Sequence, residues 1–271
     1  MIEHKVHQLK IFSSEESMGD AVGYEVGEIL REYTVKKRQK VLANFAAAPS
    51  QDAFLAQLCR EEGIEWKRVY AIHLDEYIDL ERGHPNTFEM YLRERLFDNI
   101  PIPDENVHYI KSLKGSSEEM AGQYDGIIRE HLSEIQENGG IYIACIGIGV
   151  NGHIAFNEPH VDKRTTRFVI PVEIDEVSVQ QQYDDYKNHP NPAARYSSIE
   201  DVPRKAVTVS CRGILDADKI YCTVPGQHKA DAVKGMLDGP ITDKLPASLL
   251  RMHPSLNIYL DSASASLLDN M

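Results

Sequence analysis

The apolar residues of this chain gather in two kinds of stretch that alternate along it. Short runs that are apolar at nearly every position are typical of strands buried on both faces of a parallel sheet. Such runs predict strands at residues 41–45, 69–74, 141–148, 168–172, 206–210, 219–224 and 257–260. Longer stretches with apolar residues on one helical face predict helices at residues 16–35, 51–62, 87–97, 118–137 and 227–237. This alternation predicts an α/β fold with a mostly parallel, Rossmann-like sheet and helices on both faces.

Two stretches interrupt the pattern. The segment that follows residue 74 is acidic, and we expect a loop there. Residues 180–194 are polar and contain Pro190 and Pro192, which is typical of a flexible excursion or a lid rather than of a domain boundary. A chain of 271 residues suits one large α/β domain or two small ones, and we expect a single domain over residues 1–271.

The net charge and the cysteine content limit which binding partners and which cellular compartment we expect for this protein. The formal net charge is −13, so we expect neither nucleic acid nor an anionic membrane as a partner. The four cysteines, Cys59, Cys145, Cys211 and Cys222, form no C-x-x-C pair and predict free thiols in a reducing cytoplasm. Residues 1–5 contain no apolar targeting segment, and no run approaches the roughly 18 apolar residues of a membrane span. A homo-oligomer is compatible with the sequence, which does not determine the oligomeric state.

The loop after the predicted strand 141–148 carries the candidate chemistry. The strand stops at Gly147 and Gly149, and Asn151, His153 and Glu158 follow within a few residues. Ligands of open α/β sheets bind beyond the carboxyl ends of the strands, where this loop is expected. An imidazole can act there as both general acid and general base. A purely structural hydrogen-bonding pair is the alternative interpretation.

The segment Asn-Gly-His-Ile-Ala-Phe-Asn-Glu-Pro at residues 151–159 resembles the signature loop of the glucosamine-6-phosphate deaminase (isomerase) family. Residues 73–78, 215–217 and 224–230 are similar to further elements of that family, and the resemblance extends from about residue 15 to residue 262. It implies aldose–ketose isomerisation and deamination of glucosamine 6-phosphate to fructose 6-phosphate and ammonia, a step of amino-sugar catabolism. It implies no cofactor and no metal.

The resemblance also implies roles for individual residues. His153 matches the histidine that opens the sugar ring, and Glu158 matches the acid that orients and tunes it. Asp75 matches the base that moves a proton between C2 and C1, whereas a helix cap or a solvated acid is its structural alternative. Glu76 should point elsewhere, and we expect it to have a structural role.

Phosphate recognition is expected at two strand-to-helix turns. Lys229 matches the family's phosphate-binding lysine and lies where a helix N-terminus also attracts anions. Arg195 falls near a phosphate-binding arginine of the family, and Arg164 and Arg167 are further candidates. The turn 46–50 stands where the family has a phosphate turn, and its candidate phosphate contacts are Ala47, Ala48 and Ser50.

The chain departs from the family pattern in three places. Asn151 stands where many members have Asp, but its carbonyl can still accept a hydrogen bond from the imidazole. Ala-Ala-Ala-Pro-Ser at residues 46–50 replaces the usual Thr-Gly-Gly-Thr-Pro, and alanine is strained at positive φ, so the turn should differ in shape. Residues 160–162 also differ, and we expect no allosteric activation.

Other functions stay open at this point. The same loop would suit the galactosamine 6-phosphate epimer, since the sequence does not separate the C4 epimers. A 6-phosphogluconolactonase or a non-catalytic sugar-phosphate sensor would share the architecture. A metal site formed by Asp75, His153 and Glu158 has no tight ligand spacing to support it.

Overall fold

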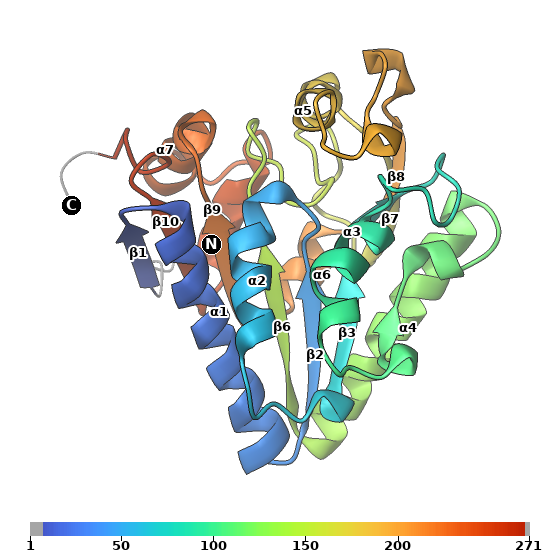
Figure 1. Ribbon diagram of the computed structural model, residues 1–271, viewed down its shortest axis with the longest axis vertical. Coiled ribbons are helices and arrows are strands. Elements are labelled where there is room, and N and C mark those ends of the chain that lie inside the picture. Colours follow the sequence, from blue (N-terminus) through green and yellow to red (C-terminus); the bar gives the residue numbers. More distant parts are fainter. Residues whose placement is uncertain (1–7, 269–271) are drawn as a thin grey trace.

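The computed structural model describes residues 8–268, and residues 1–5 lie outside that range. A seven-stranded sheet crosses the molecule in the order β1-β10-β9-β6-β2-β3-β5, with every neighbouring pair parallel (Figure 1). This confirms the predicted α/β fold with a mostly parallel sheet. The strands are β1 (Gln8–Phe12), β2 (Lys40–Phe45), β3 (Val69–His73), β5 (Val107–His108), β6 (Gly140–Ile146), β9 (Lys219–Val224) and β10 (Leu256–Asp261).

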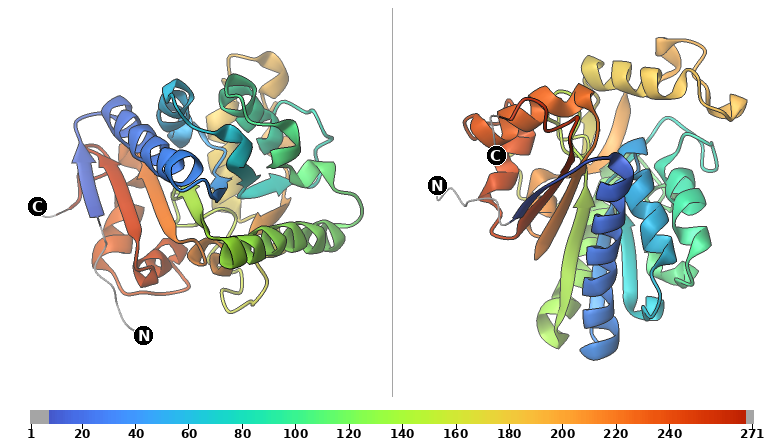
Figure 2. Two further views of the ribbon diagram at one scale, coloured as in Figure 1. Left: turned by 90° about the horizontal axis from the view of Figure 1, so that it is seen from below. Right: turned by 60° about the vertical axis from the view of Figure 1, so that its left-hand side comes forward.

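Helices cover both faces of this sheet, as the two views in Figure 2 show. One face carries α1 (Glu15–Arg31), which continues as a π-helical segment Glu32–Lys36, together with α2 (Asp52–Arg60) and α3 (Phe88–Arg95). The other face carries α4 (Ser117–Asn138), α6 (Cys211–Leu215) and α7 (Ala230–Asp238). None of the helices within the described range is long and apolar enough to cross a membrane.

Two hydrophobic cores explain why the central strands are apolar throughout. In β6, Ile141 and Ile143 pack in the core beneath α1 and α2, whereas Tyr142 and Ala144 pack in the core beneath α4. Successive side chains of a strand point to opposite faces, so a strand with a core on each side has no polar face to alternate with. The near-continuous apolar run that predicted this strand follows from that geometry.

A second, smaller sheet was not expected from the sequence. It is antiparallel, in the order β4-β8-β7, and consists of β4 (Asp75–Tyr77), β8 (Lys205–Val209) and β7 (Val169–Glu173). The chain leaves β3 at His73 and enters β4 after the single residue Leu74. The prediction of an acidic loop after residue 74 is therefore wrong for residues 75–77, which are buried and paired with residues 206–208.

The polar segment 180–194 also has more structure than expected. Its first part belongs to α5 (Glu176–Tyr186). Asp175 is the N-cap of this helix, and its side chain accepts a hydrogen bond from the Val177 N–H. A short 3-10 turn, Pro192–Ala194, follows. α5 lies beyond the carboxyl ends of the strands (Figures 1 and 2), so a helix covers the edge where ligands of such sheets bind.

Candidate active site

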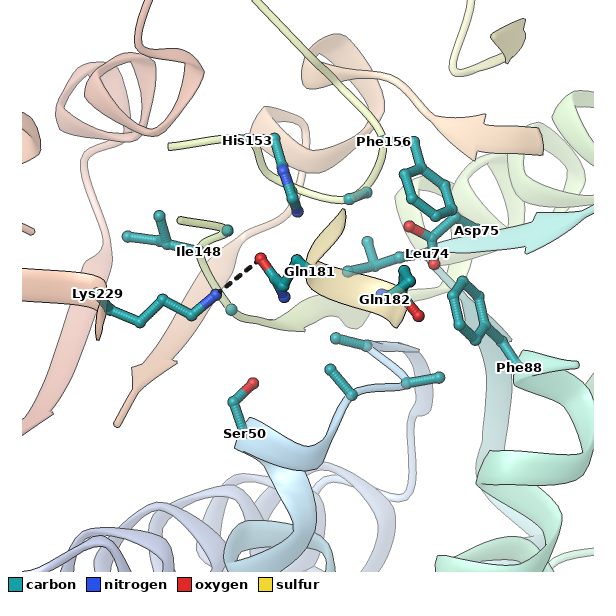
Figure 3. Close-up of a pocket in the computed structure, with 16 residues that line it drawn as sticks. Ser50, Leu74, Asp75, Phe88, Ile148, His153, Phe156, Gln181, Gln182 and Lys229 are labelled. Atoms are coloured by element: carbon teal, nitrogen blue, oxygen red, sulfur yellow. Dashed lines mark hydrogen bonds between the residues drawn. The ribbon is translucent and has the colours of Figure 1, made fainter. Parts of the chain in front are cut away.

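A cavity opens at the carboxyl ends of β2, β3, β6 and β9, where Gln181 and Gln182 of α5 also line it (Figure 3). Its empty volume, which includes space open to solvent, is about 540 Å³. Asp75 and Lys229 lie at opposite ends, and His153 lies between them on one wall. The predicted site residues that line it are Ala47, Ala48, Ser50, Asp75, His153 and Lys229.

Hydrogen bonds hold the imidazole of His153 at its Nδ1 atom. Nδ1 lies 2.8 Å from Oδ1 of Asn151 and 2.9 Å from Oγ of Ser178. The Asn151 amide in turn donates its Nδ2–H to Oε2 of Glu158 over 2.9 Å. With Nδ2 committed to a carboxylate, Oδ1 can only accept, so Nδ1 carries the ring proton and Nε2 is left as the acceptor.

Glu158 supplies a negative charge behind this histidine. Its side chain is fully buried, and Oε2 lies 3.5 Å from Nδ1 of His153. Burial alone would raise the pKa of Glu158, but the hydrogen bond and charge of His153, with hydrogen bonds from Ser178 and Asn151, lower it to about 2. Glu158 is therefore an anion at neutral pH, and it stabilises an imidazolium when one forms.

The glycines of the loop let the ring lie against the backbone. A Cβ atom at Gly149 would come within 2.1–2.3 Å of Cε1, Nε2 and Nδ1 of His153, so only glycine fits beneath the ring. Gly152 has a φ of +78°, and its N–H donates to the Gly149 carbonyl over 3.0 Å. These two glycines explain why the sequence after β6 is rich in glycine.

Asp75 and Glu76 are adjacent in the sequence, but their side chains lie in different surroundings because neighbouring residues of a strand face opposite sides. Asp75 faces the cavity beside Phe88 and Phe156. Burial raises the pKa of Asp75 well above its usual range, and the charges of Glu76 and Glu158 raise it further. A carboxylate held in this way is a stronger base than one in water.

Glu76 points to the N-terminus of α3. Its carboxylate accepts hydrogen bonds from the backbone N–H groups of Tyr77, Phe88 and Glu89, at 2.9, 3.1 and 2.9 Å. Burial raises the pKa of Glu76 to about 7, against the opposing effect of these hydrogen bonds and of Lys111. Glu76 therefore caps a helix that carries Phe88 at the cavity wall.

Lys229 lies at the other end of the cavity, in the turn between β9 and α7. Its side chain is only 4% exposed, and its Nζ donates to Oε1 of Gln181 over 3.2 Å (Figure 3). Burial lowers the pKa of Lys229 to about 8, although the nearby charge of Asp185 opposes this shift. The group still carries a proton at neutral pH, and Gln181 is a neutral partner that an anion can replace.

Comparisons with known proteins agree with this geometry. A family model described as glucosamine-6-phosphate isomerases/6-phosphogluconolactonase matches residues 14–182. The chain belongs to this family. The glucosamine-6-phosphate deaminase of Thermoanaerobacter pseudethanolicus is 32% identical over 79% of this chain and 77% of its own length. That of Clostridium perfringens is 31% identical over 96% of this chain and 99% of its own length.

Solved structures with the same fold carry both names of the family. The structure of a monomeric glucosamine-6-phosphate deaminase has a TM-score of 0.81 and 25% identity, with 96% of this chain and 99% of that chain covered. A 6-phosphogluconolactonase from Trypanosoma brucei has a TM-score of 0.71 and 16% identity over 97% and 98% of the two chains. The second likeness concerns the fold alone.

The alanine turn of this family member is not strained. Outside glycine, the residues with positive φ in the described range are Arg38 and Ala155, so Ala46, Ala47 and Ala48 all have negative φ. Pro49 then begins a 3-10 turn that leads into α2. The turn thus presents the start of a helix to the cavity, with the Ser50 hydroxyl beside it.

Three arginines proposed for phosphate lie away from this cavity. Arg195 is exposed and donates from Nε to the His189 carbonyl over 2.6 Å. Arg167 pairs with Glu118, and Arg164 lines a separate surface depression. Among residues 8–268, Lys229 is the only lysine or arginine that lines the cavity.

Sequence reasoning missed the contribution of α5. Gln181 and Gln182 line the cavity, and Ser178 contacts the imidazole. The segment looked like an irregular excursion because it is polar, and only Asp175, a residue type that often caps helices, marked a helix start. Its contacts join residues 25 or more positions apart, which no local pattern reports.

Proposed function

We propose that this protein is an amino-sugar phosphate deaminase that isomerises glucosamine 6-phosphate and releases fructose 6-phosphate and ammonia, in amino-sugar catabolism. The observation that carries the proposal is the placement of His153, backed by an anionic Glu158, between Asp75 and Lys229 in one cavity. Names shared by relatives that cover nearly the whole chain support the same activity.

The reaction follows from these positions. Nε2 of His153 takes the proton of the C1 hydroxyl, and the resulting imidazolium returns a proton to the ring oxygen, so that the sugar opens. Asp75 then removes the C2 proton and delivers a proton to C1, which converts the aldose amine to a ketimine. Water hydrolyses the ketimine to fructose 6-phosphate and ammonia. Each step is a proton transfer or a hydrolysis, and none requires a cofactor or a metal.

Lys229 holds the phosphate in this scheme. Its ammonium group releases Gln181 and binds the phosphate oxygens, while the Ser50 hydroxyl and the start of the helix at the 46–50 turn add neutral donors. Asn151 and Glu158 do not line the cavity, so their role is to orient the imidazole. Four free thiols, three of them buried, support a reducing, cytoplasmic setting.

An ammonia-release assay tests the proposal. Purified protein is incubated with glucosamine 6-phosphate, with galactosamine 6-phosphate and, separately, with 6-phosphogluconolactone, whose hydrolysis is followed by acid release. We expect ammonia from at least one amino sugar, and the His153→Ala variant should release it with a kcat about two to four decades lower. Hydrolysis of the lactone alone would identify the lactonase instead, and turnover of none would indicate a binding protein.

A further inference from the structure

Helix α5 contacts the catalytic loop and the lysine end of the cavity through two side chains of one face. Ser178 and Gln181 are three positions apart, which places them on the same side of the helix. Ser178 Oγ lies 2.9 Å from Nδ1 of His153. Gln181 Oε1 accepts from the backbone N–H of Val150 over 3.3 Å and from Nζ of Lys229 over 3.2 Å.

Ser178 occupies a place that a hydroxyl suits better than any other small group. It is 2% exposed, its Oγ lies 2.9 Å from Nδ1 of His153, and its hydroxyl helps to lower the pKa of the nearby Glu158. Glu158 as an anion can only accept, and its charge attracts the hydroxyl proton of Ser178. The oxygen lone pairs of Ser178 are then free to accept the Nδ1–H of the imidazole.

This arrangement determines which ring nitrogen carries the proton. Nδ1 faces two acceptors from different elements, Asn151 Oδ1 in the loop and Ser178 Oγ in α5. Both favour the Nδ1–H tautomer and leave the Nε2 lone pair for the substrate. Glu158 itself is 3.5 Å from Nδ1, which allows only a weak hydrogen bond, so its charge acts on the ring across this distance while Asn151 and Ser178 make the shorter contacts with Nδ1.

We propose that Ser178 is a positioning residue for His153, which holds the imidazole in its Nδ1–H tautomer from the covering helix. The proposal rests on the proposed function of His153 in ring opening. It adds a fourth member, supplied by α5, to the group formed by Asn151, His153 and Glu158. Because Ser178 does not line the cavity, its effect on the substrate passes entirely through the imidazole.

Kinetics of four α5 variants separate this role from a general structural one. Ser178→Ala removes one hydrogen bond to the ring, so kcat should fall about tenfold, with KM within roughly twofold and the pH–rate profile displaced. Gln181→Ala, on the same face but in contact with Lys229, should change KM more than kcat. Gln180→Ala, an exposed position of the same helix, should match the wild type. Ser178→Thr keeps the hydroxyl and should recover most of the lost kcat.

A nitrogen-15 NMR spectrum of histidine-labelled protein supplies a readout that needs no substrate. At alkaline pH, the His153 signals, assigned by their loss in His153→Ala, should show Nδ1 protonated in the wild type. In Ser178→Ala the Nε2–H tautomer should gain population. Unchanged spectra and an unchanged kcat in Ser178→Ala would overturn the proposal. A lower kcat accompanied by a higher KM and a lower melting temperature would also overturn it, because it would indicate a general structural defect. If the wild type released no ammonia, the proposed function would fail while the spectra still tested Ser178.

Discussion

At the residue scale, Asp75 has opposing effects on stability and on the proposed chemistry. It is a buried carboxylate beside two others, and its pKa lies well above the usual range because of burial and the charges of Glu76 and Glu158. The folded chain therefore holds this proton more tightly than the unfolded chain does. Between the unfolded and folded pKa values, the free energy of unfolding decreases as pH rises.

We predict that Asp75→Asn is inactive but more stable. An amide cannot accept the C2 proton, so ammonia release should fall by about two to four decades, and the C1 proton of fructose 6-phosphate should not exchange in heavy water. The amide also carries no buried charge, so the variant should melt at a higher temperature than the wild type at neutral pH, with the difference shrinking in acid. Normal proton exchange in Asp75→Asn would assign the base to another group.

Lys229 leads to a prediction about the pH dependence of substrate affinity. Burial lowers its pKa to about 8, and only the protonated amine attracts a phosphate. KM should therefore stay level below pH 8 and increase as pH rises through that value. Lys229→Ala should raise KM about tenfold or more, with a smaller effect on kcat. In Lys229→Ala, KM should no longer increase as pH rises through 8. If the increase persisted in this variant, a group other than Lys229 would be responsible for it.

At the element scale, one carboxylate joins the β4 strand to helix α3. Glu76 accepts three backbone N–H groups, two of them in the first turn of α3, and that helix supplies Phe88 to the cavity. Glu76 also repels Asp75 and so helps to raise the pKa of the proposed base. The cap of the helix and the basicity of Asp75 are therefore linked.

We predict that Glu76→Ala lowers the free energy of unfolding by about 2–4 kcal/mol, because three buried donors lose their acceptor. Glu76→Gln keeps one acceptor oxygen and should be less destabilised in urea unfolding. It also removes a charge beside Asp75, so the acidic limb of its pH–rate profile should move to lower pH. If the acidic limb of the Glu76→Gln profile did not move, the titration of Asp75 would not be the cause of that limb.

At the scale of the whole molecule, the two cores enclose three of the four cysteines. Cys145, Cys211 and Cys222 are buried, and burial raises the pKa of each thiol. Cys59 is partly exposed, and its thiol donates to the Arg95 carbonyl over 3.4 Å. Because the thiolate is the reactive form, these three core thiols should be inert while the fold is intact.

We predict that a thiol reagent modifies only Cys59 in the native protein, and does so slowly. The other three cysteines should become reactive as urea unfolds the protein, at the same urea concentrations as the unfolding transition measured by circular dichroism. Cys59→Ser provides the control, since its native form should show almost no reaction. Early reaction of Cys222, which lies in a central strand, would indicate that the sheet opens locally without global unfolding.

The sequence by itself determined the parts of this protein that depend on local pattern. Strands with a core on each face must be apolar throughout, so β2, β3, β6 and β9 were predicted with bounds close to those observed. The glycine-rich loop was also predictable as a ligand site, because glycines at a strand end allow the close approach that the His153 ring makes to Gly149. The positions of Asp75 and Lys229 after strands followed from the same rule about carboxyl ends.

Only the tertiary structure decided which polar groups meet. Asp75 and Glu76 looked like a solvated loop, but pairing with β8 and the N–H groups of α3 bury them. Arg195 matched a phosphate contact by its position in the chain and yet lies outside the cavity, whereas Gln181 of α5 lines the cavity and Ser178 of the same helix contacts His153. Hydrophobic periodicity records burial along a strand or helix, but hydrogen bonds between distant segments depend on how those elements pack, which no local pattern contains.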